Sequence, residues 1–400
     1  MDDLELPVVD GFRFAGIEAG IKKHGGTDLG LIVADEPVAT AAVFTENRVR
    51  AAPVETAVAR AELGRSQAVL VNSGNANACT GEAGHEAVTD TTAAVARVLG
   101  IEPGMVLPAS TGVIGEPLPA ERIVEAAPRL VEALGPARAA DFARAILTTD
   151  RGPKTAHRRV GLGSDREATL LGMAKGAGMI HPRMATTLAF VVTDAPMHST
   201  LLRRALRHAA DASFNRLTVD GETSTNDTIV VMASGRLDAP TLSGNDREAQ
   251  RFIDALDDVL GQLGRQIVAD GEGAEHVVRV EVDGAPSEDA ACKVAERVAT
   301  SLLVKTALHG CDANWGRVLS AAGMAGVSFD VKNVEIRFDD VAVVKGGVPV
   351  GELAEAQARE VMRRPEYTLR LTIGSGRAKG HYHTCDLGHE YIRVNAGYRT

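Results

Sequence analysis

The sequence predicts a mixed α/β protein whose strands and helices follow one another in an irregular order. Short apolar runs rich in β-branched residues alternate with longer stretches of helical periodicity. The helices separate the strands at uneven intervals, which argues against a regular doubly wound sheet. At 400 residues the chain exceeds an average domain, so we expect one large domain plus a smaller one, or one elaborated domain.

The expected elements follow from these two periodicities. Apolar runs predict strands at residues 29–33, 68–71, 188–192, 229–232 and 277–282. Helical spacing predicts helices at residues 86–99, 120–134, 139–147, 201–212, 247–269, 289–308 and 353–363. Turn residues at 283–288 lie between a strand and a long helix, so we predict a catalytic domain at residues 1–283 and a C-terminal domain at residues 284–400.

Composition and charge narrow the classes of partner. The formal net charge of -10 argues against nucleic acid, because phosphate binding needs a basic surface. No apolar run approaches membrane-spanning length, and the acidic N-terminus lacks the features of a secretory signal. The four cysteines lie far apart without a C-x-x-C pair, as in reduced proteins. We therefore expect a cytoplasmic protein that acts on a small molecule, with no membrane partner.

A Gly- and Pro-containing loop runs directly into an apolar strand at Thr186. A threonine hydroxyl needs a base, and one solution is a threonine whose own α-amino group becomes that base after backbone cleavage. The small side chain of Ala185 leaves room for the Thr186 hydroxyl to attack the Ala185 carbonyl. Taken alone, the local pattern favours two threonines that merely open a buried strand.

Several long strings, taken together, resemble the ornithine acetyltransferase (ArgJ) family. They include KGAGMIHPRMAT at 175–186, VNSGNANACTG at 71–81, ASTGVIG at 109–115 and SFNRLTVDGETSTNDT at 213–228. Shorter matches lie at residues 11–16, 148–150, 270–274, 304–307, 314–317 and 395–400. The resemblance therefore runs through the whole chain in order.

The resemblance implies a fold and an activity. The fold is an αββα-type sandwich resembling N-terminal-nucleophile enzymes (DmpA/ArgJ-like), with a smaller C-terminal α/β domain. The activity is ping-pong transfer of acetyl from N2-acetylornithine to glutamate in arginine biosynthesis, without a cofactor. Acetyl-CoA as an additional donor stays open, since no residue decides it. Two copies of each cleaved chain, alpha and beta, are expected to form a heterotetramer.

The resemblance also assigns roles to residues. Thr186 is the nucleophile, Ala185-Thr186 is the scissile bond, and Thr111 with Gly112 forms the oxyanion hole. The substrate-binding set is Thr149, Lys175, Thr186, Glu272, Asn395 and Thr400. Lys175 and Thr149 suit a substrate carboxylate, and Glu272 suits an ammonium group. Without the family, residues 110–115 read as an ordinary turn, and a lone Lys or Glu reads as a solvated surface charge.

Two other groups of residues are candidate metal sites, and two other functions are compatible with the sequence. Four residues offer oxygen ligands for a metal ion but lack the spacing of a calcium-binding loop. They are Asp220, Glu222, Asn226 and Asp227. Zinc ligand types occur at His381, His383, Cys385 and His389, although the family implies no metal and surface or core-edge histidines are favoured. Two rival functions remain: a self-cleaving amidohydrolase or aminopeptidase of related fold, and a non-catalytic binding protein.

Overall fold

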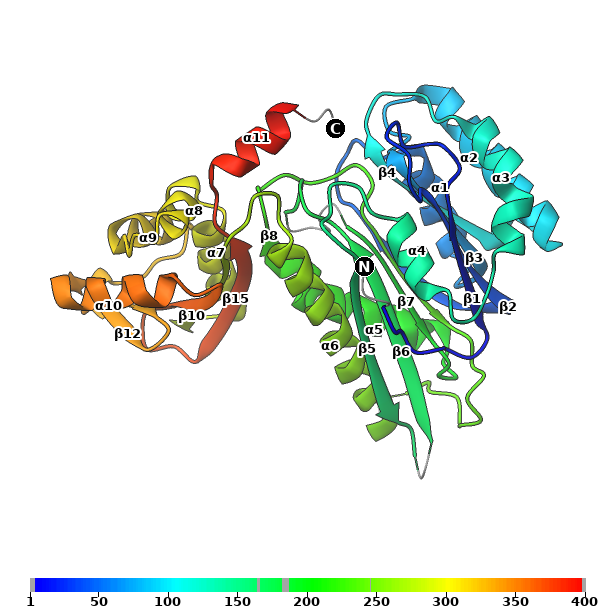
Figure 1. The fold of residues 1–400 in the computed structure, drawn as a ribbon. Coiled ribbons are helices and arrows are strands. Elements are labelled where there is room, and N and C mark those ends of the chain that lie inside the picture. The colour runs from blue at the N-terminus through cyan, green and yellow to red at the C-terminus, as the bar shows by residue number, and fades with distance from the viewer. Residues whose placement is uncertain (1–3, 164–165, 182–186, 245, 398–400) are drawn as a thin grey trace.

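The computed structural model describes residues 4–163, 166–181, 187–244 and 246–397. Figure 1 shows a larger lobe, coloured blue to green, beside a smaller lobe coloured yellow to red. Helix α11 (His389–Gly397) runs from the smaller lobe back toward the larger one. Helix α11 therefore contacts the larger lobe, through Asn395 to Glu272 and Tyr391 to Asp220.

Strand β2 (Leu29–Phe44) organises the larger lobe. Its first half pairs with β1 (Phe12–Ile17) and β3, and its second half pairs with β9. The register with β3 shifts between Val33 and Val38. The sheet therefore folds over along β2. Its order is β4-β3-β2-β9-β7-β6-β5, with the remaining strands β3 (Arg65–Asn75), β4 (Val106–Val113), β5 (Lys154–Gly161), β6 (Glu167–Lys175), β7 (Leu188–Thr193) and β9 (Thr228–Ala233).

The two halves of this sheet enclose one core together with one short helix, and the other helices cover their outer faces. Val69 of one half and Met232 of the other belong to the same buried cluster. Phe142 of the intervening helix packs edge-on against Phe190, with ring centroids 5.4 Å apart. This arrangement confirms the predicted αββα sandwich. Its helices are α1 (Ala52–Ala61), α2 (Gly81–Leu99) and α3 (Ala120–Glu132) around the first half, α4 (Ala139–Ala145) between the halves, and α5 (Ser199–Ala212) and α6 (Arg247–Ala269) on the second.

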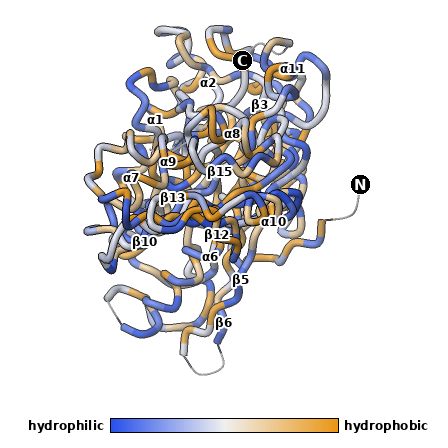
Figure 2. Tube along the Cα trace, turned by 90° about the vertical axis from the view of Figure 1, so that its left-hand side faces the viewer, coloured by the Kyte–Doolittle hydropathy of each residue, from blue (hydrophilic) through white to orange (hydrophobic). Residues whose placement is uncertain are grey.

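The smaller lobe is a second sheet with helices packed against a single apolar core. Hydrophobic and hydrophilic residues alternate along the tube through this lobe in Figure 2, where β10, β12 and β15 are labelled. Its strand order is β13-β12-β11-β14-β10-β15-β8. The bounds are β8 (Leu217–Thr218), β10 (Val277–Ala285), β11 (Glu335–Phe338), β12 (Val341–Lys345), β13 (Val348–Pro349), β14 (Glu366–Thr372), β15 (Ala378–Cys385), α7 (Glu288–Ala299), α8 (Leu302–His309), α9 (Trp315–Gly323) and α10 (Glu352–Met362).

Two details differ from simple expectation. The predicted helix at 289–308 is two helices, because the Ser301 side chain accepts the Val304 N–H and starts a new helix there. The predicted boundary after Asp283 falls within β10, and β8 from the preceding segment extends the second sheet at β15. Short 3-10 helices cover Pro103–Met105, Phe214–Arg216 and Val331–Asn333.

Within the described ranges, no helix combines the length and the apolar character needed to cross a membrane.

Candidate active site

One pocket of about 450 Å³ brings together the predicted site residues that the structure describes. Strand ends of the larger lobe and one helix of the C-terminal segment form its walls. The predicted residues lining it are Thr111, Gly112, Thr149, Lys175, Glu272 and Asn395. Ala185, Thr186 and Thr400 lie outside the described residues.

Thr111 and Gly112 lie near the end of β4, beside the parallel strand β3. Gly112 has φ +135°, a backbone conformation that favours glycine. A Cβ atom at Gly112 would lie 2.3 Å from the backbone carbon of Gly74. The close approach of β3 and β4 therefore requires glycine at position 112. The side chain of the adjacent Thr111 lines the pocket.

Lys175 is the last residue of β6, and its side chain is buried. Its Nζ donates a hydrogen bond to Thr111 Oγ1 at 3.4 Å and lies 3.9 Å from Asp150 Oδ2. Burial lowers the pKa of Lys175, and the charge of Asp150 opposes that shift. The ammonium group is thus held between the candidate oxyanion hole and a buried carboxylate.

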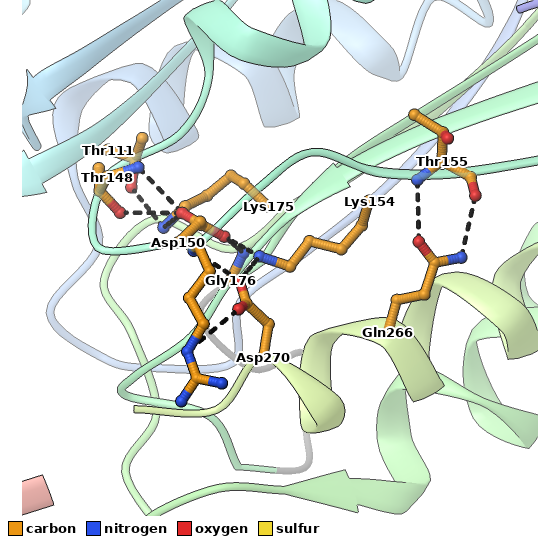
Figure 3. Close-up of polar contacts among 10 residues, drawn as sticks. Thr111, Thr148, Asp150, Lys154, Thr155, Lys175, Gly176, Gln266 and Asp270 are labelled. Carbon is orange, nitrogen blue, oxygen red and sulfur yellow. Dashed lines mark hydrogen bonds and ion pairs between the residues drawn. The ribbon is translucent and has the colours of Figure 1, made fainter. Parts of the chain in front are cut away.

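Asp150 connects several segments of the site, as Figure 3 shows. Its carboxylate accepts the backbone N–H groups of Thr148 at 2.9 Å and Gly176 at 2.6 Å. Lys154 bridges Asp150 and Asp270 with its ammonium group. Burial alone would raise the pKa of Asp150, but Lys175 and Lys154 outweigh it and hold that pKa well below the usual range. Asp150 is therefore a buried carboxylate in its charged form.

Glu272 lies in the loop between α6 and β10, and its carboxylate packs onto Gly178. A Cβ at Gly178 would come within 2.5 Å of Glu272 Oε2, so only glycine leaves room for this carboxylate. The Glu272 backbone N–H donates to the Ala177 carbonyl at 2.9 Å. Asn395 of α11 donates its side-chain amide to Glu272 Oε2 at 2.8 Å. Tertiary contacts thus place the C-terminal helix against the pocket.

Two aspartates brace the chain on either side of the undescribed residues 182–186. Asp220 accepts the backbone N–H groups of Met179 at 2.6 Å and Ile180 at 2.8 Å. Asp227 Oδ1 accepts the Thr187 N–H at 2.8 Å. Burial raises the pKa of Asp227 well above its ordinary value, with the Thr187 hydrogen bond acting in the opposite direction. The sequence singled out both aspartates only as weak metal-ligand candidates.

Asp150 and Asp270 were not assigned a role from the sequence, although both lie in strings that carried the resemblance. Lys154 joins the two aspartates, but Asp270 lies 116 residues from Lys154 in sequence. A local sequence pattern therefore does not show that they are neighbours. Only the fold joins the end of α6 to the start of β5.

No group of three or more His, Cys, Asp or Glu side chains suited to a metal occurs among the described residues. His381 and His383 do lie on one face, with ring centroids 5.6 Å apart. His389 instead faces His309, and Cys385 is buried beside Lys305. The four zinc ligand types singled out in the sequence therefore do not converge.

Comparison with known proteins gives consistent matches. The sequence model described as "ArgJ family" matches residues 13–400. "Arginine biosynthesis bifunctional protein ArgJ" of Geobacter sulfurreducens is 48% identical over 392 residues, covering 98% of this chain and 100% of the relative. The protein of that name from Syntrophotalea carbinolica is 46% identical over 392 residues, covering 98% and 99%. The crystal structure of Arginine biosynthesis bifunctional protein argJ from Bacillus halodurans has a TM-score of 0.51 at 38% identity, and the match covers 52% of this chain and 98% of the solved chain.

Proposed function

The chain belongs to the ArgJ family, and from that premise we propose that it is a glutamate N-acetyltransferase of arginine biosynthesis. It takes the acetyl group from N2-acetylornithine, carries it on Thr186 and passes it to glutamate. The observation that carries the proposal is the single pocket formed by residues as distant in sequence as Thr111 and Asn395. Such convergence is typical of a binding site and not of scattered surface charges.

The nucleophile arises by self-cleavage at Ala185-Thr186. The Thr186 hydroxyl attacks the Ala185 carbonyl, and hydrolysis of the resulting ester frees the Thr186 amine as a base. Two observations support this step. Asp227 anchors the backbone N–H of Thr187, the next residue, and the solved Bacillus halodurans chain is about half as long as this one.

The transfer then proceeds in two halves. Thr186 Oγ attacks the acetyl carbonyl, the amide C–N bond breaks, and ornithine leaves with a proton from the Thr186 α-amino group. Thr111 and the Gly112 N–H stabilise the oxyanion. The glutamate amine then attacks the acetyl ester and releases N-acetylglutamate.

The polar groups of the pocket suit an amino acid. Glu272 supplies a carboxylate for a substrate ammonium group, and Lys175 with Thr149 supplies donors for a carboxylate. Asn395 and Thr400 complete the proposed set. The relatives' name "bifunctional" supports a second activity, and acetyl-CoA stays open as its donor because no residue decides it.

The proposed enzyme uses no cofactor, because the nucleophile, base and oxyanion donors all come from the chain. It acts in the cytoplasm, which the absence of disulfides among its four cysteines supports. Two copies of each cleaved chain assemble as a heterotetramer.

A single-turnover experiment tests the mechanism. With N-acetylornithine alone, the fragment beginning at Thr186 should gain one acetyl group by mass and release about one equivalent of ornithine before turnover stops. Glutamate should restart turnover and remove the acetyl group. Continuous release of acetate without an amine acceptor would instead identify the rival amidohydrolase. Absence of any acetylated fragment during glutamate-dependent turnover would exclude Thr186 as the acetyl carrier.

A further inference from the structure

The contact between Lys175 and Thr111 has a defined direction. An ammonium group has donors and no acceptor, so Thr111 Oγ1 must accept at 3.4 Å. Thr111 keeps its own hydroxyl proton, and among the described residues no acceptor takes it. Because Thr111 lines the pocket, that proton is available to an atom inside it.

Asp150 holds the Lys175 ammonium group in this place. The Asp150 side chain is fully buried, and its Oδ2 lies 3.9 Å from Lys175 Nζ. Two backbone N–H groups, from Thr148 and Gly176, fix the carboxylate. Gly176 directly follows Lys175, so one carboxylate fixes both the backbone and the side chain at the end of β6.

The charge of Asp150 is as relevant as its position. Lys175 also faces Glu272 and Asp227, which favour its charged form, and Lys154 and Lys22, which disfavour it. Among these groups, Asp150 raises the pKa of Lys175 most, and it opposes the lowering caused by burial. A neutral residue at position 150 would leave a buried cation poorly compensated.

We propose that Asp150 is a positioning residue of the oxyanion hole: it keeps the Lys175 ammonium group bound to Thr111 Oγ1, so that the Thr111 hydroxyl proton points to the oxyanion. The proposal rests on the acetyltransferase function given above. In this proposal Lys175 also acts on the oxyanion indirectly, by orienting the hydroxyl of Thr111. The donated hydrogen bond also polarises the hydroxyl and strengthens its own donation to a developing negative charge.

The test is Asp150→Asn, which keeps the shape and an acceptor oxygen but removes the charge. Acetyl transfer from N-acetylornithine to glutamate is measured against pH, after mass spectrometry has shown that the chain is cleaved. We expect kcat to fall by at least about 10-fold, a larger factor than the accompanying rise in KM, to which Lys175 contributes as the proposed donor to the substrate carboxylate. The alkaline limb of the kcat profile should move to lower pH, because Lys175 loses its proton more easily without the Asp150 charge.

Asp258→Asn is the matched control, since Asp258 is a half-exposed partner of Arg158 on the outer helix α6. It should leave kcat and its pH profile unchanged. A loss of kcat in Asp150→Asn without any shift of the alkaline limb would show a merely structural role and overturn the proposal. A rise in KM with unchanged kcat would also overturn it. Wild-type protein without transfer activity would instead contradict the proposed function itself.

A double-mutant cycle decides the question if Asp150→Asn does not fold or cleave. Lys175→Met and Thr111→Ala are compared singly and together. If Lys175 acts through Thr111, Lys175→Met should lower kcat far less in the Thr111→Ala background than in wild type. Additive losses would show that the two residues act independently, against the proposal.

Discussion

The side-chain amide of Asn395 donates a hydrogen bond to Glu272 Oε2 at 2.8 Å, although 123 residues separate them in sequence. Helix α11, which carries Asn395, has no buried residue. A second polar contact joins the hydroxyl of Tyr391 to Asp220 at 3.3 Å. These polar contacts attach helix α11 to the pocket and orient the Glu272 carboxylate.

Replacing Asn395 should therefore weaken substrate binding more than chemistry. We expect Asn395→Ala to raise the KM for N-acetylornithine by roughly 3- to 10-fold, with kcat nearly unchanged, because one hydrogen bond to a charged group is lost. Steady-state kinetics measure both constants. Arg393→Ala on the same helix is the control, since Arg393 pairs only locally with Glu390 among the described residues. If both substitutions raise KM equally, the effect comes from a general change in helix α11 and not from the hydrogen bond between Asn395 and Glu272.

Self-cleavage should replace the 41.9 kDa chain with two fragments, the second beginning at Thr186. Denaturing electrophoresis and mass spectrometry measure this directly. Thr186→Ala should stay intact, because the attacking hydroxyl is gone. Thr187→Ser, one residue later, keeps the backbone N–H bound to Asp227 and should still cleave. A wild-type chain that is active yet uncleaved would exclude the α-amino group as the base.

The proposed oxyanion hole predicts different behaviour for its two members. Thr111→Ala should lower kcat by about 10²- to 10³-fold, equivalent to about 2.7 to 4 kcal/mol of transition-state stabilisation, while Thr111→Ser keeps the hydroxyl and much of the activity. Gly112→Ala should reduce both activity and thermal stability, because its Cβ would lie 2.3 Å from the Gly74 backbone. Kinetics and thermal unfolding separate these effects. Unchanged kcat in Thr111→Ala would place the oxyanion hole elsewhere.

The paired histidines of β15 predict loss of stability in acid. Burial, followed by the charge of Arg279, lowers the pKa of His381 to about 4; burial, followed by His381, lowers that of His383 to about 3. The unfolded chain has a histidine pKa of about 6.5. Both histidines are neutral in both states above that pH. Below pH 6.5 the unfolded state binds protons on these histidines, whereas the folded state keeps them neutral. The free energy of unfolding should therefore fall as the pH drops from 6.5 toward 4.

Thermal unfolding between pH 7 and about 4 measures this dependence. His383→Leu removes one buried histidine and should make Tm fall less steeply with decreasing pH. His24→Gln, at an exposed position, is the control and should retain the wild-type slope. An equally steep slope in His383→Leu would assign the acid sensitivity to other groups.

The sequence by itself determined the fold class, several elements and the candidate residues of the site. The period of the apolar residues predicted a helix at 247–269, which α6 matches at both ends. The strand at 188–192 lies within β7 (Leu188–Thr193). These segments were predictable because each buries one continuous face or run, which local periodicity encodes. The motif strings supplied the candidate site residues, and those that the structure describes line one pocket.

Tertiary structure alone decided which segments meet. Strand β2 extends from Leu29 to Phe44, well beyond the predicted residues 29–33, because three neighbouring strands satisfy its backbone in turn. The ion network of Asp150, Lys154 and Asp270 likewise exists only where α6 ends beside β5. A buried charge is stable only beside its counter-charge, and a local pattern does not contain a partner more than a hundred residues away. The sequence therefore supplied the candidates for the reacting groups, and the fold placed the charged groups beside them.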